Sequence, residues 1–107
     1  QAEAQAAVEG GSGLVVLTDE RASDSRITIP MILATAAVHK RLTDTGLRSF
    51  VSIVVRSAEV LDPHGFAVLV GVGATAVNAW LAQEMFQERL DRGAYLGLSL
   101  RDACLNY

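Results

Sequence analysis

The chain has 107 residues and a net charge of −3; half of its residues are hydrophobic and one-fifth are charged. It is too apolar for a disordered protein and suits one small domain or part of a larger one. The basic residues are scattered, so no nucleic-acid partner is expected. No apolar run approaches the ~18 residues of a membrane helix, so no membrane partner is expected. The single cysteine, Cys104, excludes an internal disulfide and suits a reducing, cytoplasmic location.

The first half of the chain predicts a helix, a strand and a second helix. Residues 1–9 are strong helix formers that end in a glycine-rich stop. The apolar run 14–17 predicts a strand buried on both faces, as in a parallel sheet. The polar residues 18–28 predict a loop at its carboxyl end, more typical of a solvated loop or an interdomain contact than of a site. Pro30 then opens a helix expected over residues 31–45.

The second half continues this alternation. The β-branched run 50–55 predicts a second buried strand, parallel to the first because a helix connects the two. Asp62 and Pro63 predict the start of another helix. A long helix is expected over residues 75–92, and residues 99–102 resemble a capping box. Together these elements predict an α/β fold of short parallel strands alternating with helices, a partial-barrel-like connecting domain.

One motif has the residues of a nucleotide site. Gly71, Gly73 and Ala76 fit G-x-G-x-x-A, the loose dinucleotide fingerprint. A phosphate cradle needs a strand that enters Gly71 and a helix that opens just after it. A helix that ends at these glycines is the favoured interpretation, and a buried strand without a ligand is the third. Asp91 has the spacing of the acid that such a site requires, but it lies in the last turn of an expected helix, typical of a solvated charge.

Few other residues suggest chemistry. His39 and His64 lack the spacing of metal ligands. His39 is expected to be favoured by a helix dipole or to be hydrogen-bonded, and His64 to be neutral and either buried or in contact with a neighbouring domain. Cys104 is expected to be a buried structural residue. A further hypothesis is an interaction segment that dimerises through Trp80 and Met85.

Many short segments of the chain, all in the same order, resemble those of a known family. They run from Gly13-Leu14-Val15-Val16-Leu17-Thr18-Asp19 through Ile29-Pro30 and Ser57-Ala58-Glu59 to the run 64–78. Over roughly residues 10–84 they resemble the central domain of the glutamate synthase large subunit. The chain departs from the family pattern at Gly65, where a second histidine is usual, at Val72, where an aromatic is usual, and at Ala79, where proline is usual.

The resemblance implies a function of a longer polypeptide. Such enzymes hydrolyse glutamine in an amidotransferase domain and pass ammonia internally to a domain with FMN and an iron–sulfur cluster. There the ammonia and 2-oxoglutarate give glutamate. The resemblance implies that residues 1–107 are a single α/β segment excised from the central domain, with those two domains, and in some enzymes an electron-donating small subunit, as partners. No catalytic, cofactor or metal residue is expected in it. The alternative is a small nucleotide-binding module that uses Gly71, Gly73 and Ala76.

Overall fold

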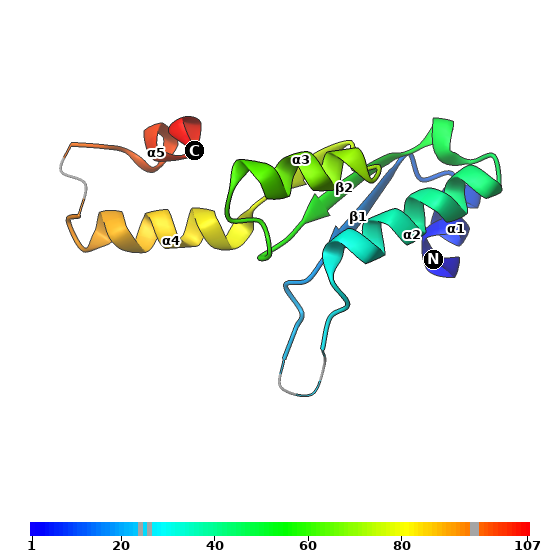
Figure 1. The fold of residues 1–107 in the computed structure, drawn as a ribbon, viewed down its shortest axis with the longest axis horizontal. Helices are drawn as coiled ribbons and strands as arrows, with labels where there is room; N and C mark the ends of the chain where they lie inside the picture. The colour runs from blue at the N-terminus through cyan, green and yellow to red at the C-terminus, as the bar shows by residue number, and fades with distance from the viewer. Residues whose placement is uncertain (24, 26, 95–96) are drawn as a thin grey trace.

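The computed structural model describes residues 1–107 except 24, 26, 95 and 96 (Figure 1). Helices and strands alternate over residues 2–91, as the sequence predicts, and a last helix follows. In order, the elements are α1 (Ala2–Glu9), β1 (Leu14–Thr18), α2 (Met31–Asp44), the 3-10 turn η1 (Arg48–Phe50), β2 (Ser52–Arg56), α3 (Pro63–Gly71), β3 (Ala76–Asn78), α4 (Trp80–Asp91) and α5 (Leu100–Asn106).

The strands form an open parallel sheet in the order β1-β2-β3. Each strand therefore pairs with the next one along the chain, with α2 and α3 as the helical connections. Val15 lies opposite Ile53, and Val55 lies between Leu17 and Val77. The α/β class and the parallel strands predicted from the sequence are thus confirmed.

The helices α2 and α3 lie side by side against one face of this sheet (Figure 1). On that face, Val15, Ile53 and Val55 are buried with residues of both helices. The other face is open, and the side chains of Leu14 and Val16 are 54% and 52% exposed. The prediction of strands buried on both faces is therefore wrong. Burial alternates along β1 and β2, because no layer of the described residues covers the second face.

Helix α3 begins and ends where the favoured interpretation of the glycine motif places it. The Asp62 side chain accepts a hydrogen bond of 2.7 Å from the Gly65 backbone N–H, and Pro63 is the first helical residue. Both features satisfy or avoid the unpaired N–H groups of a helix start. The helix ends at Gly71, so residues 66–70 are helical.

The long helix expected over residues 75–92 is wrong in its first turn. The Thr75 N–H donates to the Ile53 carbonyl at 2.7 Å, and the Ser57 N–H donates to the Asn78 carbonyl at 2.9 Å. Pairing with β2 thus makes β3 from residues 76–78, and α4 begins only at Trp80. A three-residue strand with Val77 as its one β-branched residue leaves too short a pattern to recognise.

The last two helices extend away from the sheet and pack on each other (Figure 1). They contribute to the elongated shape, which measures 51 × 32 × 24 Å. The capping box predicted at Ser99 and Asp102 is present at the start of α5. The ring of Tyr107 meets those of Phe66 and Phe86 edge-on, with centroids 5.9 and 5.1 Å apart, and so ties α5 to α3 and α4.

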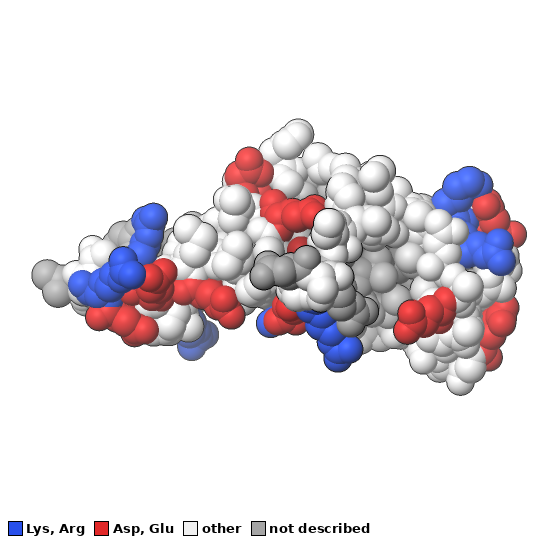
Figure 2. All heavy atoms as spheres, turned by 90° about the horizontal axis from the view of Figure 1, so that it is seen from below, with Lys and Arg blue, Asp and Glu red and all other residues white. Residues whose placement is uncertain are grey.

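The face seen in Figure 2 carries charges of both signs in small clusters, with no broad patch of one sign. That distribution differs from the continuous positive surface typical of nucleic-acid binding. Within the described ranges, no helix combines the length and the apolar character needed to cross a bilayer.

Candidate functional site at the carboxyl edge of the sheet

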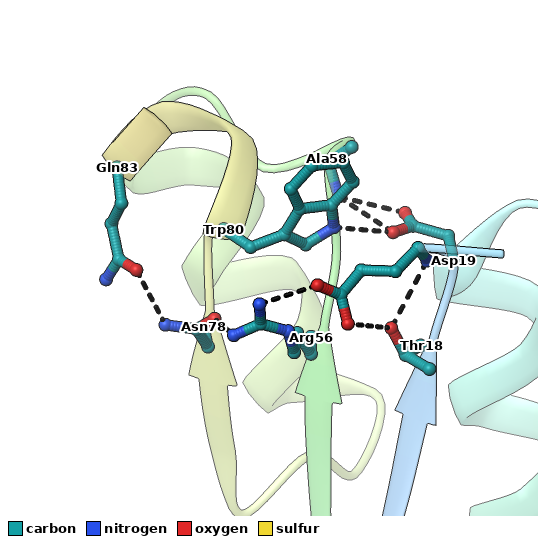
Figure 3. Close-up of polar contacts among 8 residues, drawn as sticks. Thr18, Asp19, Arg56, Ala58, Asn78, Trp80 and Gln83 are labelled. Atoms are coloured by element: carbon teal, nitrogen blue, oxygen red, sulfur yellow. Dashed lines mark hydrogen bonds and ion pairs between the residues drawn. The ribbon is translucent and has the colours of Figure 1, made fainter. Parts of the chain in front are cut away.

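The polar side chains of the three strand ends converge at one edge of the sheet (Figure 3). Because the strands are parallel and in register, Thr18, Arg56 and Asn78 lie opposite one another at their carboxyl ends. The residues that follow each strand lie there too. In open α/β sheets this edge is the usual position of a ligand site.

Asp19 is the centre of this cluster, and its carboxylate joins the ends of all three strands. The residue is only 6% exposed. After β2, the Ser57 hydroxyl and the Ala58 N–H donate to it at 2.7 and 2.9 Å. After β3, the indole N–H of Trp80 donates at 2.8 Å. We call Asp19, Ser57, Ala58 and Trp80 the carboxyl clasp.

These donors keep Asp19 charged. Burial by itself raises the pKa of the Asp19 carboxyl, but the hydrogen bonds from Trp80, Ser57 and Ala58 outweigh burial and bring the pKa below its ordinary value. Both carboxylate oxygens are engaged by donors of the chain itself. An acceptor so occupied suits a structural junction better than a general base, which needs a free lone pair for its substrate.

A second polar layer lies nearer the solvent. Arg56 donates to the Asn78 side-chain oxygen at 2.9 Å and to Glu20 at 2.6 Å. The hydrogen bond from Arg56 lowers the pKa of Glu20, and the same bond raises the pKa of Arg56. Since the Arg56 and Glu20 side chains are 40% and 37% exposed, this layer is open to water.

The glycine motif lies at the opposite, amino edge of the sheet. Gly71 ends α3 and Ala76 begins β3, so the order is helix, turn, strand. A phosphate cradle needs the reverse order, in which a helix N-terminus follows the glycines. The geometry that this alternative requires is therefore not formed by these residues.

The requirement for glycine at position 73 has a packing explanation. Its φ is +120°, a conformation that L side chains rarely adopt. A Cβ atom there would lie 2.4 Å from the ring of His39 on α2. Gly73 thus allows the turn after α3 to lie directly on α2.

Arg48 holds the same turn. Its Nε donates to His39 Nδ1 at 3.0 Å, and its two terminal nitrogens donate to the carbonyls of Val51 at 2.6 Å and Gly73 at 2.8 Å. We call Arg48, His39 and Gly73 the amino-edge clamp. His39 is therefore hydrogen-bonded, one of the two roles predicted for it.

The remaining predicted residues do not gather with the clasp. His64 is exposed, so of its two alternatives burial inside this segment is wrong. Cys104 is half-buried rather than buried. Asp91 is exposed at the end of α4, as predicted, and accepts a hydrogen bond from the Gln87 side chain. Met85 is 42% exposed.

Among the described residues, no three His, Cys, Asp or Glu side chains could share a metal ion.

Sequence reasoning placed the polar loop correctly but missed its central residue. Asp19 belongs to the polar stretch that the sequence predicts to be a solvated loop. Two other charged residues of that stretch, Asp24 and Arg26, lie outside the described residues. A signal was present: Asp19 and Ser57 each follow a predicted strand, and the carboxyl ends of parallel strands meet. Trp80 had no such signal, because β3 was not predicted.

Comparison with known proteins identifies the family. The glutamate synthase central domain family matches residues 1–106. The chain belongs to this family. It is 52% identical over 105 residues to the glutamate synthase [NADPH] large chain of Azospirillum brasilense and 37% identical over 105 residues to that of Bacillus subtilis. In both cases the match covers 98% of the central-domain chain and 7% of the relative.

Ferredoxin-dependent enzymes are similar as well. The chloroplastic ferredoxin-dependent glutamate synthase of Oryza sativa subsp. japonica is 45% identical over 84 residues, which cover 77% of this central-domain segment and 5% of the rice protein. The segment thus spans a small fraction of the length of the curated relatives that it matches.

The cofactors implied for glutamate synthases do not fit the residues of this segment. An iron–sulfur cluster needs several cysteine thiolates, and the chain has one cysteine. For a flavin phosphate, the glycine motif lacks the strand–glycine–helix order, as its glycines follow a helix. Neither group is assigned to this central-domain segment.

Proposed function

We propose that this segment is part of a connecting scaffold in a cytoplasmic glutamate synthase and has no catalytic residue of its own. The parent chain converts glutamine and 2-oxoglutarate into two glutamates with internal transfer of ammonia. An amidotransferase domain and a domain with FMN and an iron–sulfur cluster, in the same chain, are the partners of the scaffold. In some parent enzymes an electron-donating small subunit completes the assembly.

The carboxyl clasp is the observation that supports this proposal. A buried, charged carboxylate receives donors that follow two other strands, so the three strand ends are fixed relative to one another. The groups at the edge where α/β sheets usually bind ligands are thus engaged in holding the sheet together. Such an edge suits a frame better than a site that must exchange its partners for a substrate.

A frame of this kind has a physical task in the parent enzyme. Ammonia that reaches bulk water is diluted and protonated, so two distant sites share it efficiently only when their separation and the route between them are fixed. Charge-assisted hydrogen bonds at a buried carboxylate resist deformation more strongly than neutral ones. The carboxyl clasp therefore contributes rigidity between the two reactions rather than a chemical step.

The test is Asp19→Asn in the full-length enzyme, with Asp44→Asn as the matched control because Asp44 is an exposed carboxylate paired with Lys40. Three rates are measured: glutamine hydrolysis, glutamate formation from added ammonium and 2-oxoglutarate, and glutamate formation from glutamine. We expect Asp19→Asn to retain the first two rates, to lower the third and to release free ammonia. Asp44→Asn should leave all three unchanged.

One result would contradict the proposal. If Asp19→Asn abolished glutamine hydrolysis or the ammonium-dependent reaction while the thermal unfolding midpoint stayed unchanged, Asp19 would be a catalytic residue. The segment would then contain part of an active site.

A further inference from the structure

An apolar groove runs along the free edge of β1. It has a volume of about 570 Å³ and lies between β1, α1, α2 and residues 28–31. Most of its lining residues are aliphatic, and they include the small side chains of Ala4, Ala7 and Ala34. Polar residues complete the lining (Gln1, Glu3, Thr18 and Thr28). Small residues at these positions leave the volume that larger aliphatic side chains of an added element would fill.

Among the described residues, no strand pairs with the outer edge of β1, so its backbone presents unpaired groups to this groove. The Gly13 carbonyl accepts from Ser52 N–H at 3.0 Å, and the Asp19 N–H donates to the Arg56 carbonyl at 3.4 Å. With the two-residue period of a strand, the odd-numbered residues of β1 therefore face β2. The N–H and C=O groups of Leu14, Val16 and Thr18 face the opposite edge, and these residues line the groove.

The residues of β1 lack the sequence features that protect a free edge strand. Exposed edge strands usually carry charged residues, proline or a bulge that prevents further pairing. The five residues of β1 are Leu-Val-Val-Leu-Thr, with neither charge nor proline. They pair with β2 in register without interruption. Such an edge is typical of an interior strand of a sheet.

Helix α1 packs on the sheet in the same way as α2. Helix α2 packs on both β1 and β2, the two strands that it connects. Helix α1 packs on β1 and beside α2, one step further along the sheet (Figure 1). A parallel crossover joins neighbouring strands, so this is the position that a helix takes between β1 and a strand on its other side.

We propose that an extended segment of the parent polypeptide N-terminal to α1 lies in this groove and pairs with β1 as a parallel strand. Its residues on the side of α1 and α2 are aliphatic, and its backbone bonds the outward groups of Leu14, Val16 and Thr18. The open sheet is thereby continued within one polypeptide. This inference rests on membership of the longer family, since the relatives extend far beyond the segment, and not on the scaffold function.

The test is residue-resolved hydrogen exchange on the full-length enzyme. The Val16 and Thr18 amides report on the proposed strand, while the Val15 and Leu17 amides, which face β2, are internal controls. We expect Val16 and Thr18 to exchange more slowly than unprotected amides by on the order of a hundredfold or more, as the controls do. Fast exchange at Val16 and Thr18 beside slow exchange at Val15 and Leu17 would overturn the proposal.

A pair of variants gives a second measurement. Val16→Pro removes the outward N–H, whereas Val16→Thr keeps it and keeps the β-branched shape. Proline is tolerated on an edge strand with its nitrogen toward solvent, but not where that N–H is paired. We therefore expect Val16→Pro to lower the thermal midpoint of the full-length enzyme and Val16→Thr to leave it nearly unchanged. Equal midpoints would contradict the added strand.

Two controls separate this proposal from others. Protection of Val16 that appears only as the enzyme associates would assign the groove to a second copy and overturn the intramolecular strand. Fast exchange at Val16 together with normal transfer of ammonia to glutamate would reject the strand while leaving the scaffold function intact.

Discussion

The two ends of the sheet are held by different chemistry. At the carboxyl edge, a buried carboxylate accepts hydrogen bonds from donors that follow two other strands. At the amino edge, the guanidinium of Arg48 donates to His39 and to the carbonyls of Val51 and Gly73. One edge is therefore joined by an anion and the other by a cation.

The contrast shows how a motif can mislead. The amino edge has the glycines of a nucleotide site, yet one of them is explained by contact with His39. The carboxyl edge has a polar loop that matches no known motif, yet this loop contains the buried Asp19. Position relative to the strand ends was the better guide, because parallel strands bring distant residues together there.

Gly73→Ala should have the largest effect on stability, because it disrupts the amino-edge clamp both by overpacking and by backbone strain. The new Cβ would meet the His39 ring, and its φ of +120° disfavours any L side chain. Overpacking and backbone strain together predict a loss of about 3 to 5 kcal/mol in the free energy of unfolding. Urea denaturation of the 107-residue chain measures this.

Gly71→Ala is the matched control, since its Cβ would meet nothing within 4 Å and Gly71 is helical. It should be neutral or stabilising by up to about 1 kcal/mol. A nucleotide site would instead make both glycines matter for binding. Dinucleotide binding that both substitutions weaken equally would contradict the packing account.

Asp19→Ala should have the next largest effect, because it removes the acceptor of the carboxyl clasp. Leaving the buried Ser57 hydroxyl and the Trp80 indole N–H without their partner predicts a loss of about 2 to 3 kcal/mol. Asp44→Ala removes an exposed carboxylate and should cost at most about 0.5 kcal/mol. Thermal unfolding of both variants checks the difference. Equal losses would show that the carboxyl clasp contributes no more stability than an exposed ion pair.

The carboxyl clasp also predicts a pH dependence. Because the pKa of folded Asp19 is lowered, its stabilisation is present above the unfolded value of about 4 and is lost as the pH falls through the folded value. The difference in unfolding free energy between wild type and Asp19→Asn should be constant from about pH 7 to pH 5 and shrink below about pH 4. A difference that grew on acidification would have the wrong sign.

Glu20→Gln should have the smallest effect. It removes the ion pair with Arg56 in the outer layer of the carboxyl edge, where water screens both groups. We expect a change in melting temperature smaller than that of Asp19→Ala, and smaller still at high salt. A loss as large as that of Asp19→Ala would place the stabilising interaction in the outer layer.

The sequence predicts the repeating parts of this fold better than the exceptions. Local sequence patterns predict the helix caps at Asp62 and Ser99. Local patterns also predict the strands around Val15 and Ile53. The strand at Val77 was missed because it is formed by pairing with β2, a long-range interaction that outweighs local helix propensity. Trp80 joins the carboxyl clasp only because that strand ends beside it.

The most direct test of the account is a double-mutant cycle between Asp19 and Trp80. Trp80→Phe keeps an aromatic ring and removes the N–H that donates to Asp19, and Asp19→Ala removes the carboxylate that accepts this hydrogen bond. Urea unfolding of wild type, both single variants and the double variant gives the coupling energy. A carboxyl clasp predicts a coupling of about 1 to 2 kcal/mol between the two residues. Additive losses would contradict it and leave the strand ends without a common junction.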